Sequence, residues 1–203
     1  MQQKVLLIFI FSVIYTLSFA QTANDYFQKG LDKYVRYQEE GIEQDIPGAI
    51  MDFSEALSLA SDSSDLLGIA TDSSLILMWR ATAKSELEDY RGAIIDYKKA
   101  IKKGFGRNIH IQYIRISENY VKIKKYEEAI RFLNKAIEHG REFGLVDPSS
   151  PVGPDISMAR AFFNRGILKI RIGNKEEGCL DLSKAGEIGY EDAYKAIREH
   201  CDN

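Results

Sequence analysis

The sequence is built around a short pattern that recurs four times along the chain. In each copy a small residue is followed, twelve or more residues later, by Ala-Ile or a close variant, and a further alanine ends the pattern. The small residues of the four copies are Gly30/Ala49/Ala56, Ala81/Ala93/Ala100, Ser117/Ala129/Ala136 and Gly166/Gly178/Ala185. Repetition of this length is typical of stacked arrays, in which each copy buries its apolar face against the next one.

Each copy reads as two antiparallel helices joined by a turn. In the second copy, apolar residues follow a helical period over 75–81, a turn falls at Glu88-Asp89, and Tyr90 begins the next periodic stretch. Small residues let two helix backbones approach closely, while large neighbours fill the space around them. Polar residues that can cap free N–H groups precede three of the second helices: Asp45, Asp89 and Asn174.

This pattern resembles the tetratricopeptide repeat (TPR) family, whose helix–turn–helix unit has small residues at the same three positions. The resemblance covers nearly all of residues 23–188 and implies an all-α fold. The implied architecture is a right-handed helical-hairpin solenoid of four TPR-like helix pairs plus a C-terminal capping helix. The expected boundaries are about 23–60 (repeat one), 74–104 (repeat two), 110–140 (repeat three) and 159–188 (repeat four), with the capping helix at about 190–201.

The spacing of the copies departs from the 34-residue period of the family. The intervals between equivalent residues of consecutive copies are 44, 36 and 49 residues. The extra residues predict loop insertions at 61–73 and 141–155. Three of the four prolines lie in the second insertion, which favours an exposed ordered loop over a domain boundary. The role of this loop stays open, since a contact loop and a plain spacer fit the sequence equally well.

Three charged positions change together among the copies. Repeats one, two and four carry two cations four residues apart on the first helix and an aspartate on the second. These sets are Lys29/Lys33/Asp52, Arg80/Lys84/Asp96 and Arg165/Lys169/Asp181, and repeat three has Ile116/Tyr120/Phe132 instead. Because neighbouring cations repel each other, we predict that the aspartate pairs with one or both cations and fixes the helix register. Coincidence among solvated faces is the alternative. A ladder of anion-binding sites is less favoured, since each cation set has its own counter-ion.

The chain contains two cysteines, Cys179 in the last second helix and Cys201 near the end. Antiparallel helices place the start of one beside the end of the other, so the two sulfurs can meet across the turn at 186–190. In an exported protein this arrangement predicts a disulfide. Two separate buried thiols are the alternative. A zinc site that also uses His200 lacks a fourth ligand.

Residues 1–20 have the organisation of a signal peptide. Lys4 provides the positive start, residues 5–17 are apolar, and Ser18-Phe19-Ala20 is a small-x-small cleavage site. An uncleaved membrane anchor is the alternative, but the apolar run is shorter than a bilayer span requires. We therefore expect an exported protein of bacterial type, periplasmic or extracellular, with residues 21–203 as the TPR solenoid and no membrane span after cleavage.

The mature chain carries 26 basic and 30 acidic residues, a formal net charge of −4. A mildly acidic balance argues against nucleic acid as the main partner. None of the three histidines lies near a nucleophile motif or has metal-ligand spacing. We expect a protein that is not an enzyme and that uses no cofactor, no metal and no catalytic residues.

The family resemblance implies a concave surface lined by the first helices. Carried over by position, the residues that face it or lie beside it are Phe27, Leu31, Tyr34, Met78, Trp79, Ile114, Glu118, Val121, Arg160, Phe163, Ile167 and Ile170. Such a mostly apolar strip favours a scaffold that binds an apolar peptide or helix of another exported protein. One alternative is that part of the strip packs between neighbouring helices, and another is a permanent structural subunit of a cell-envelope assembly. The identity of the partner and the oligomeric state do not follow from the sequence.

Overall fold

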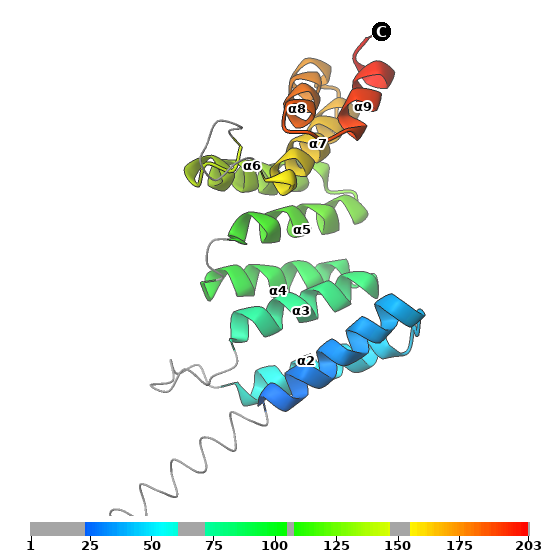
Figure 1. Ribbon diagram of the computed structural model, residues 1–203, viewed down its shortest axis with the longest axis vertical. Helices are drawn as coiled ribbons and strands as arrows, with labels where there is room; N and C mark the ends of the chain where they lie inside the picture. Colours follow the sequence, from blue (N-terminus) through cyan, green and yellow to red (C-terminus); the bar gives the residue numbers. More distant parts are fainter. Residues whose placement is uncertain (1–22, 61–71, 105–107, 147–154, 203) are drawn as a thin grey trace, which may run out of the picture. The chain divides into compact units, whose positions relative to one another are not determined.

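The computed structural model describes residues 23–60, 72–104, 108–146 and 155–202, and their regular structure is helical (Figure 1). Residues 23–40 form the first described helix. The other helices are α2 (Asp45–Leu59), α3 (Ser73–Glu86), α4 (Tyr90–Lys102), α5 (Ile109–Lys122), α6 (Tyr126–Glu142), α7 (Ile156–Arg171), α8 (Lys175–Glu187) and α9 (Asp192–His200). The predicted all-α class is therefore confirmed. The predicted signal peptide, residues 61–71 of the first loop insertion and residues 147–154 of the second lie outside the described residues.

The chain divides into two compact halves, Met1–Phe105 and Gly106–Asn203. In the N-terminal half, α2 packs against α3 and α3 against α4. Phe27 on helix 23–40 contacts Phe53 on α2, with ring centroids 5.9 Å apart. Both rings belong to a buried apolar cluster that also contains Ile76 of α3. This cluster holds the helices of the N-terminal half together.

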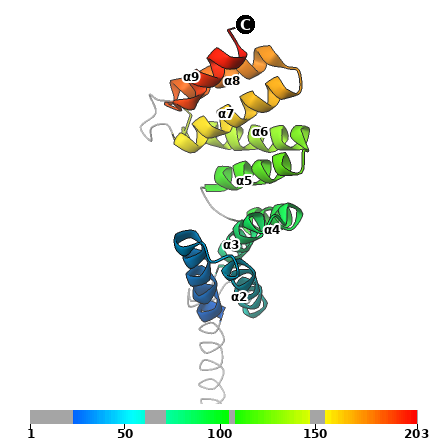
Figure 2. The same ribbon diagram turned by 90° about the vertical axis from the view of Figure 1, so that its right-hand side faces the viewer.

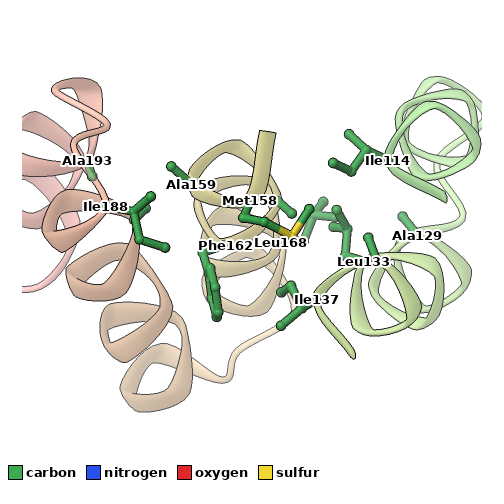
Figure 3. Packing of buried hydrophobic residues seen from close by; sticks show 13 residues of the cluster. Ile114, Ala129, Leu133, Ile137, Met158, Ala159, Phe162, Leu168, Ile188 and Ala193 are labelled. Carbon is green, nitrogen blue, oxygen red and sulfur yellow. The ribbon is translucent and has the colours of Figure 1, made fainter. Parts of the chain in front are cut away.

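In the C-terminal half, α5 pairs with α6 and α7 with α8, while α6 packs against α7 and α9 against α8 (Figure 2). Figure 3 shows the buried side chains that fill the space between these helices. Ile114 of α5, Leu133 of α6 and Met158 of α7 are fully buried in this cluster. These buried side chains of α5, α6 and α7 are therefore covered by neighbouring helices within the half.

Small residues allow the paired helices to approach each other. A Cβ atom added at Gly166 of α7 would lie 2.8 Å from the carbonyl oxygen of Gly178 on α8. A Cβ at Gly30 would lie 2.6 Å from Cε1 of Phe53. Such distances leave no room for a side chain, which explains why small residues recur at these positions.

The end of the second predicted insertion is tied to the fold. The backbone N–H of Asp155 donates to the carbonyl of Leu145, and Leu145 and Val146 pack against the core of the C-terminal half. Asp155 then caps α7 by accepting a hydrogen bond from the Ser157 N–H at 2.8 Å. The residues on both sides of 147–154 therefore lie against the helical core.

Candidate functional site

The C-terminal half carries a groove of about 330 Å³ between α5 and α7. Val121 of α5 and Phe163 and Ile167 of α7 form its apolar wall, and all three are only partly buried. Phe163 also packs against Tyr190, with ring centroids 4.9 Å apart. Both helices therefore contribute apolar side chains to the groove, and Val121 and Phe163 also pack against the helical core.

Three cations and one carboxylate line the same groove. Glu118 lies between two arginines, with Oε1 3.7 Å from Arg160 Nε and Oε2 3.3 Å from Arg115 Nη1. Arg171 donates a hydrogen bond of 3.3 Å to the hydroxyl of Tyr126. Lys122 is exposed at the edge of the groove. The local balance of Lys122, Arg160 and Arg171 against Glu118 is positive, although the whole chain is acidic.

Five residues predicted to line a concave surface lie in this groove: Glu118, Val121, Arg160, Phe163 and Ile167. Ile170 is half-buried and faces α8, because a Cβ at Gly178 would lie 2.5 Å from its Cγ1. The groove also uses Lys122, Asn164 and Arg171, which sequence reasoning missed. These residues lie one to four positions after the carried-over ones, and a wider stripe on each helix would have included them.

The remaining predicted residues of the N-terminal half lie on helix 23–40 and α3. Leu31, Tyr34 and Trp79 are partly buried against the core, and the rings of Tyr34 and Trp79 meet edge to face at 5.5 Å. Met78 is also half-buried. Contact of these four residues with a partner stays a prediction.

Two of the predicted contact residues are unavailable to a partner. Phe27 is 5% exposed and packs on Phe53, and Ile114 is 0% exposed within the core of the C-terminal half. Their assignment to a contact surface is therefore wrong. The physical reason is that the stripe facing a groove adjoins the stripe facing the core, and here neighbouring helices cover these positions.

The charged sets are brought together within their repeats. In repeat two, Arg80 donates two hydrogen bonds to Asp96, from Nε to Oδ2 at 2.8 Å and from Nη2 to Oδ1 at 2.9 Å. Lys84 Nζ lies 2.7 Å from Asp96 Oδ2. In repeat four, Arg165 Nε lies 2.8 Å and Lys169 Nζ 3.0 Å from Asp181 Oδ2. Both aspartates are buried away from bulk water, and in each repeat the two cations neutralise the charge of the aspartate.

Repeats one and three differ from this arrangement. In repeat one Lys33 Nζ lies 2.6 Å from Asp52, whereas Lys29 lies over the ring of Tyr26, 4.9 Å from its centroid. In repeat one the aspartate therefore pairs with one of the two cations, Lys33, as the prediction of one or both cations allows. In repeat three the rings of Tyr120 and Phe132 stack with centroids 5.6 Å apart, and Ile116 is fully buried.

The arginines of the charged sets also reach the preceding repeat. Arg80 Nη1 donates to Ser54 Oγ of α2 at 3.1 Å, and Arg165 Nη1 donates to Asn134 Oδ1 of α6 at 2.7 Å. Ser54 and Asn134 occupy the same position in their repeats, two residues after Asp52 and Phe132. Each arginine therefore joins two consecutive repeats as well as the two helices of its own repeat.

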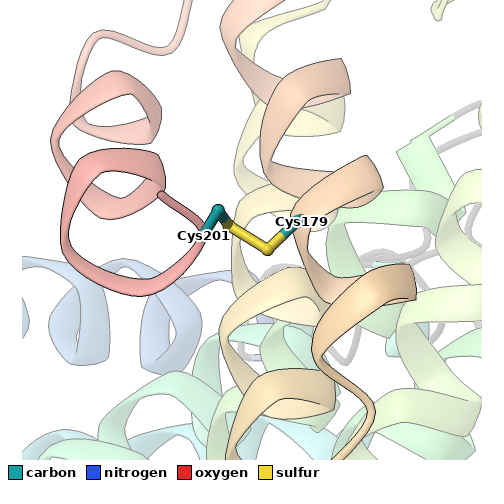
Figure 4. The surroundings of a disulfide bond; sticks show 2 residues. All are labelled: Cys179 and Cys201. Carbon is teal, nitrogen blue, oxygen red and sulfur yellow. A yellow bond between two sulfur atoms is a disulfide. The ribbon is translucent and has the colours of Figure 1, made fainter. Parts of the chain in front are cut away.

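A disulfide joins Cys179 of α8 to Cys201, directly after α9 (Figure 4). This bond joins the two cysteines of the chain, so neither is a free thiol. The hydroxyl of Tyr194 on α9 donates to the carbonyl of Gly186 at 3.1 Å. The capping helix is therefore held to α8 by a covalent bond at its end and by packing along its length.

A pair of histidines lies close to the start of α7. His110 is buried and its ring stacks on His139 with centroids 5.6 Å apart, while Asp155 Oδ2 lies 3.4 Å from His110 Nε2. Burial lowers the pKa of His139, and neighbouring His110 lowers it further, with Glu142 opposing them. Burial works to raise the pKa of Asp155, but the hydrogen bond from the Ser157 N–H and the nearby His110 outweigh it and lower that pKa.

Within the described ranges, no three or more His, Cys, Asp or Glu side chains are placed to hold a metal ion. None of the helices in the same ranges combines the length and hydropathy needed to cross a membrane.

Several solved structures share the fold of this chain. MamA is 17% identical with a TM-score of 0.60, and the match covers 85% of this chain and 81% of that one. BtubC from P. vanneervenii is 15% identical with a TM-score of 0.61, covering 87% and 72%. The N-terminal domain of stress-induced protein-1 from C. elegans is 21% identical with a TM-score of 0.53, covering 63% and 94%. At these identities the likeness shows the fold, which is that of helical-hairpin repeat proteins.

The sequence comparison identifies the repeat itself. Residues 113–138, within repeat three, match the tetratricopeptide repeat family. No curated protein matches the chain by sequence. The predicted resemblance to the tetratricopeptide repeat family is therefore confirmed.

Proposed function

We propose that the protein is a protein–protein interaction scaffold that binds an apolar peptide or helix in the groove between α5 and α7. The observation that carries this proposal is the apolar wall of Val121, Phe163 and Ile167, which stays accessible in a hollow of the surface. Accessible apolar side chains in a groove are typical of contact sites. The tetratricopeptide match over 113–138 supports the proposal, because repeat scaffolds use such surfaces to hold partners.

The charges around the groove narrow the chemistry of the partner. Lys122, Arg160 and Arg171 surround the apolar wall, and Glu118 offsets only part of their charge. A segment that places an acidic side chain next to its apolar residues complements this surface. The partner segment is therefore apolar with acidic flanks.

The partner is another exported protein in this proposal. The signal-like residues 1–20 and the disulfide between Cys179 and Cys201 support export, because disulfides persist in oxidising compartments. Final residence is in the periplasm or outside the cell.

A pull-down from cell-envelope extracts tests the proposal. We expect the natural protein to recover a partner that a Phe163→Glu, Ile167→Glu variant does not, because two carboxylates in an apolar wall cannot be desolvated on binding. Phe163 also supports Tyr190, so a Lys122→Glu variant tests the exposed edge without touching the core. It is expected to weaken recovery through charge alone.

Leu180→Glu is the matched control, since Leu180 is 70% exposed on α8 and does not line the groove. Equal partner recovery by the natural protein and the groove variants would contradict the proposal. Size-exclusion chromatography of the natural protein distinguishes a scaffold with a free monomer from a permanent subunit of an envelope assembly.

A further inference from the structure

The solvent-facing side of α4 carries cations and one apolar residue. Its buried side consists of Ala93, Ile94, Asp96, Tyr97 and Ala100. Its exposed residues are Arg91, Ile95, Lys98, Lys99 and Lys102, followed by the exposed C-cap Lys103. Ile95 is 53% exposed in the middle of this face. The only carboxylate within α4, Asp96, is buried in its ion pairs with α3.

The exposed sides of the other second helices do not share this composition. Those of α2 and α8 combine an exposed apolar residue with carboxylates, and that of α6 mixes both signs of charge. The exposed charged and large apolar residues are Met51 and Glu55 on α2, Glu127, Arg131, Lys135, Glu138, Arg141 and Glu142 on α6, and Lys175, Glu176, Glu177, Leu180 and Glu187 on α8. A basic face is therefore a property of α4 and not of the repeat.

The helix dipole accounts for only some of the cations on the exposed face of α4. Lys99 and Lys102 lie in the last turn, where cations stabilise a helix through its dipole. Arg91 lies in the first turn, where a cation opposes the dipole. Lys98 and Lys103 make other contacts. Among the described residues, no carboxylate forms an ion pair with Arg91, Lys99 or Lys102.

Apart from Asp96, which is paired with α3, the acidic residues closest to α4 in the sequence lie before its start. Glu88 and Asp89 precede α4, about ten residues before Lys99. At 1.5 Å per residue this separation is about 15 Å, which exceeds the Debye length at physiological salt. The C-terminal end of α4 therefore presents a positive charge that those two carboxylates do not offset.

The lysines and Ile95 on the exposed face of α4 suit a partner whose negative charge is spread over a surface. Lysine is a compact, hydrated point charge, whereas arginine gives the paired hydrogen bonds of specific recognition. The apolar residue on this face is aliphatic, whereas proteins that hold single-stranded nucleic acid add aromatic side chains for stacking. An aliphatic side chain flanked by lysines suits the headgroup boundary of a bilayer, where the chain enters and the ammonium groups stay outside.

We propose that the exposed face of α4 binds the surface of an anionic phospholipid bilayer. The helix lies flat on the headgroups, with Ile95 at the acyl boundary and Lys99 and Lys102 among the phosphates. This contact needs no membrane-spanning helix and uses none of the residues that line the groove of the C-terminal half. The two surfaces lie on different helices and are tested separately.

Co-sedimentation with vesicles tests this assignment. We expect the natural protein to bind vesicles of phosphatidylcholine and phosphatidylglycerol at low salt, and to bind vesicles of phosphatidylcholine alone much more weakly. High salt is expected to remove most of the difference. A Lys99→Gln, Lys102→Gln variant should lose about fivefold in partition coefficient for each lysine.

Two matched variants make the test specific. Lys125→Gln, Lys195→Gln removes the same charge from exposed lysines on other elements and should change binding little. Ile95→Ala should weaken binding at every salt concentration, while Leu180→Ala should not. Melting temperatures of all variants check that the fold is retained.

Three results would overturn the assignment. The first is equal binding to anionic and neutral vesicles, and the second is an equal loss in the control lysine variant. The third is binding of duplex DNA in preference to vesicles that depends on Lys99 and Lys102, which would assign the face to nucleic acid.

Discussion

At the scale of single residues, Asp96 illustrates how the repeats are held in register. Its side chain is 2% exposed and receives Arg80 and Lys84, and the same arginine reaches Ser54 on α2. One carboxylate therefore fixes two helices of a repeat and orients the arginine that links this repeat to the one before. The equivalent set at Asp181 repeats this arrangement in the C-terminal half.

Removing Asp96 should be more damaging than replacing the whole set. We expect Asp96→Ala to lower the free energy of unfolding by about 3 kcal/mol, because two partly buried cations lose their counter-ion. Repeat three has an apolar set at the same three positions. A triple variant that copies this set into repeat two should therefore recover much of the lost stability: Arg80→Ile, Lys84→Tyr, Asp96→Phe. Urea denaturation followed by circular dichroism measures both. A loss below about 1 kcal/mol for Asp96→Ala would contradict a structural role for the ion pair.

His139 makes the stability of the C-terminal half depend on pH. Burial, and then His110, lower its pKa in the folded state, so folding favours the neutral ring. Its contribution is fully present above the unfolded pKa of about 6.5 and is lost as the pH falls from there toward the lower folded pKa.

We therefore expect the melting temperature to fall between pH 7 and pH 5, and to fall less in a His139→Phe variant. The phenyl ring keeps the stacking on Phe143, whose centroid lies 4.5 Å from that of His139. Parallel pH profiles for the two proteins would show that another group causes the loss.

At the scale of helices, α9 depends on its covalent bond. It spans nine residues, fewer than an isolated helix needs to be stable in water, and only Ala193 and Ala196 are buried. The disulfide closes a loop of 22 residues, which corresponds to about 3 kcal/mol in the chain-entropy account.

We expect a Cys179→Ser, Cys201→Ser variant to lose roughly that stability and to exchange the amide hydrogens of α9 much faster. Hydrogen exchange read by mass spectrometry measures this loss helix by helix. The helices α5 and α6 are the internal control. Unchanged exchange in α9 would show that packing alone holds it.

The sequence predicts the helices well because small and apolar residues recur at a helical period. The ends of the helices were harder to predict. Asp89 caps α4 by accepting from the Gly92 N–H at 2.9 Å, but Asn174 makes no such bond, and Asp45 lies inside α2 and pairs with Arg36. Position before a helix favours a cap, whereas the side-chain rotamer and competing partners decide whether it forms.

The candidate site was only partly predictable for a related reason. Five of the carried-over positions on α5 and α7 line the groove: Glu118, Val121, Arg160, Phe163 and Ile167. An apolar stripe does not distinguish a side chain covered by the next helix from one left open, which is why Phe27 and Ile114 were misassigned. The arginine links to Ser54 and Asn134 were not predicted, because nothing in the sequence distinguishes these two acceptors from other polar residues on α2 and α6.

At the scale of the whole molecule, the proposed functions depend on where the protein resides. The signal-like segment lies outside the described residues, so export stays a prediction. Mass spectrometry of the protein purified from its natural source should find Gln21 as the first residue, because cleavage is predicted after Ala20. A chain that still begins at Met1 would favour the membrane anchor, which would still place the cysteines in an oxidising compartment.

The most direct test of the central proposal is site-specific photo-crosslinking in living cells. A photoreactive amino acid at position 167 lies in the groove, and one at position 180 lies on an exposed surface outside it. We expect a discrete adduct with a partner protein from position 167 and none from position 180. An adduct from position 180 with none from position 167 would contradict the assignment of the groove as the contact site.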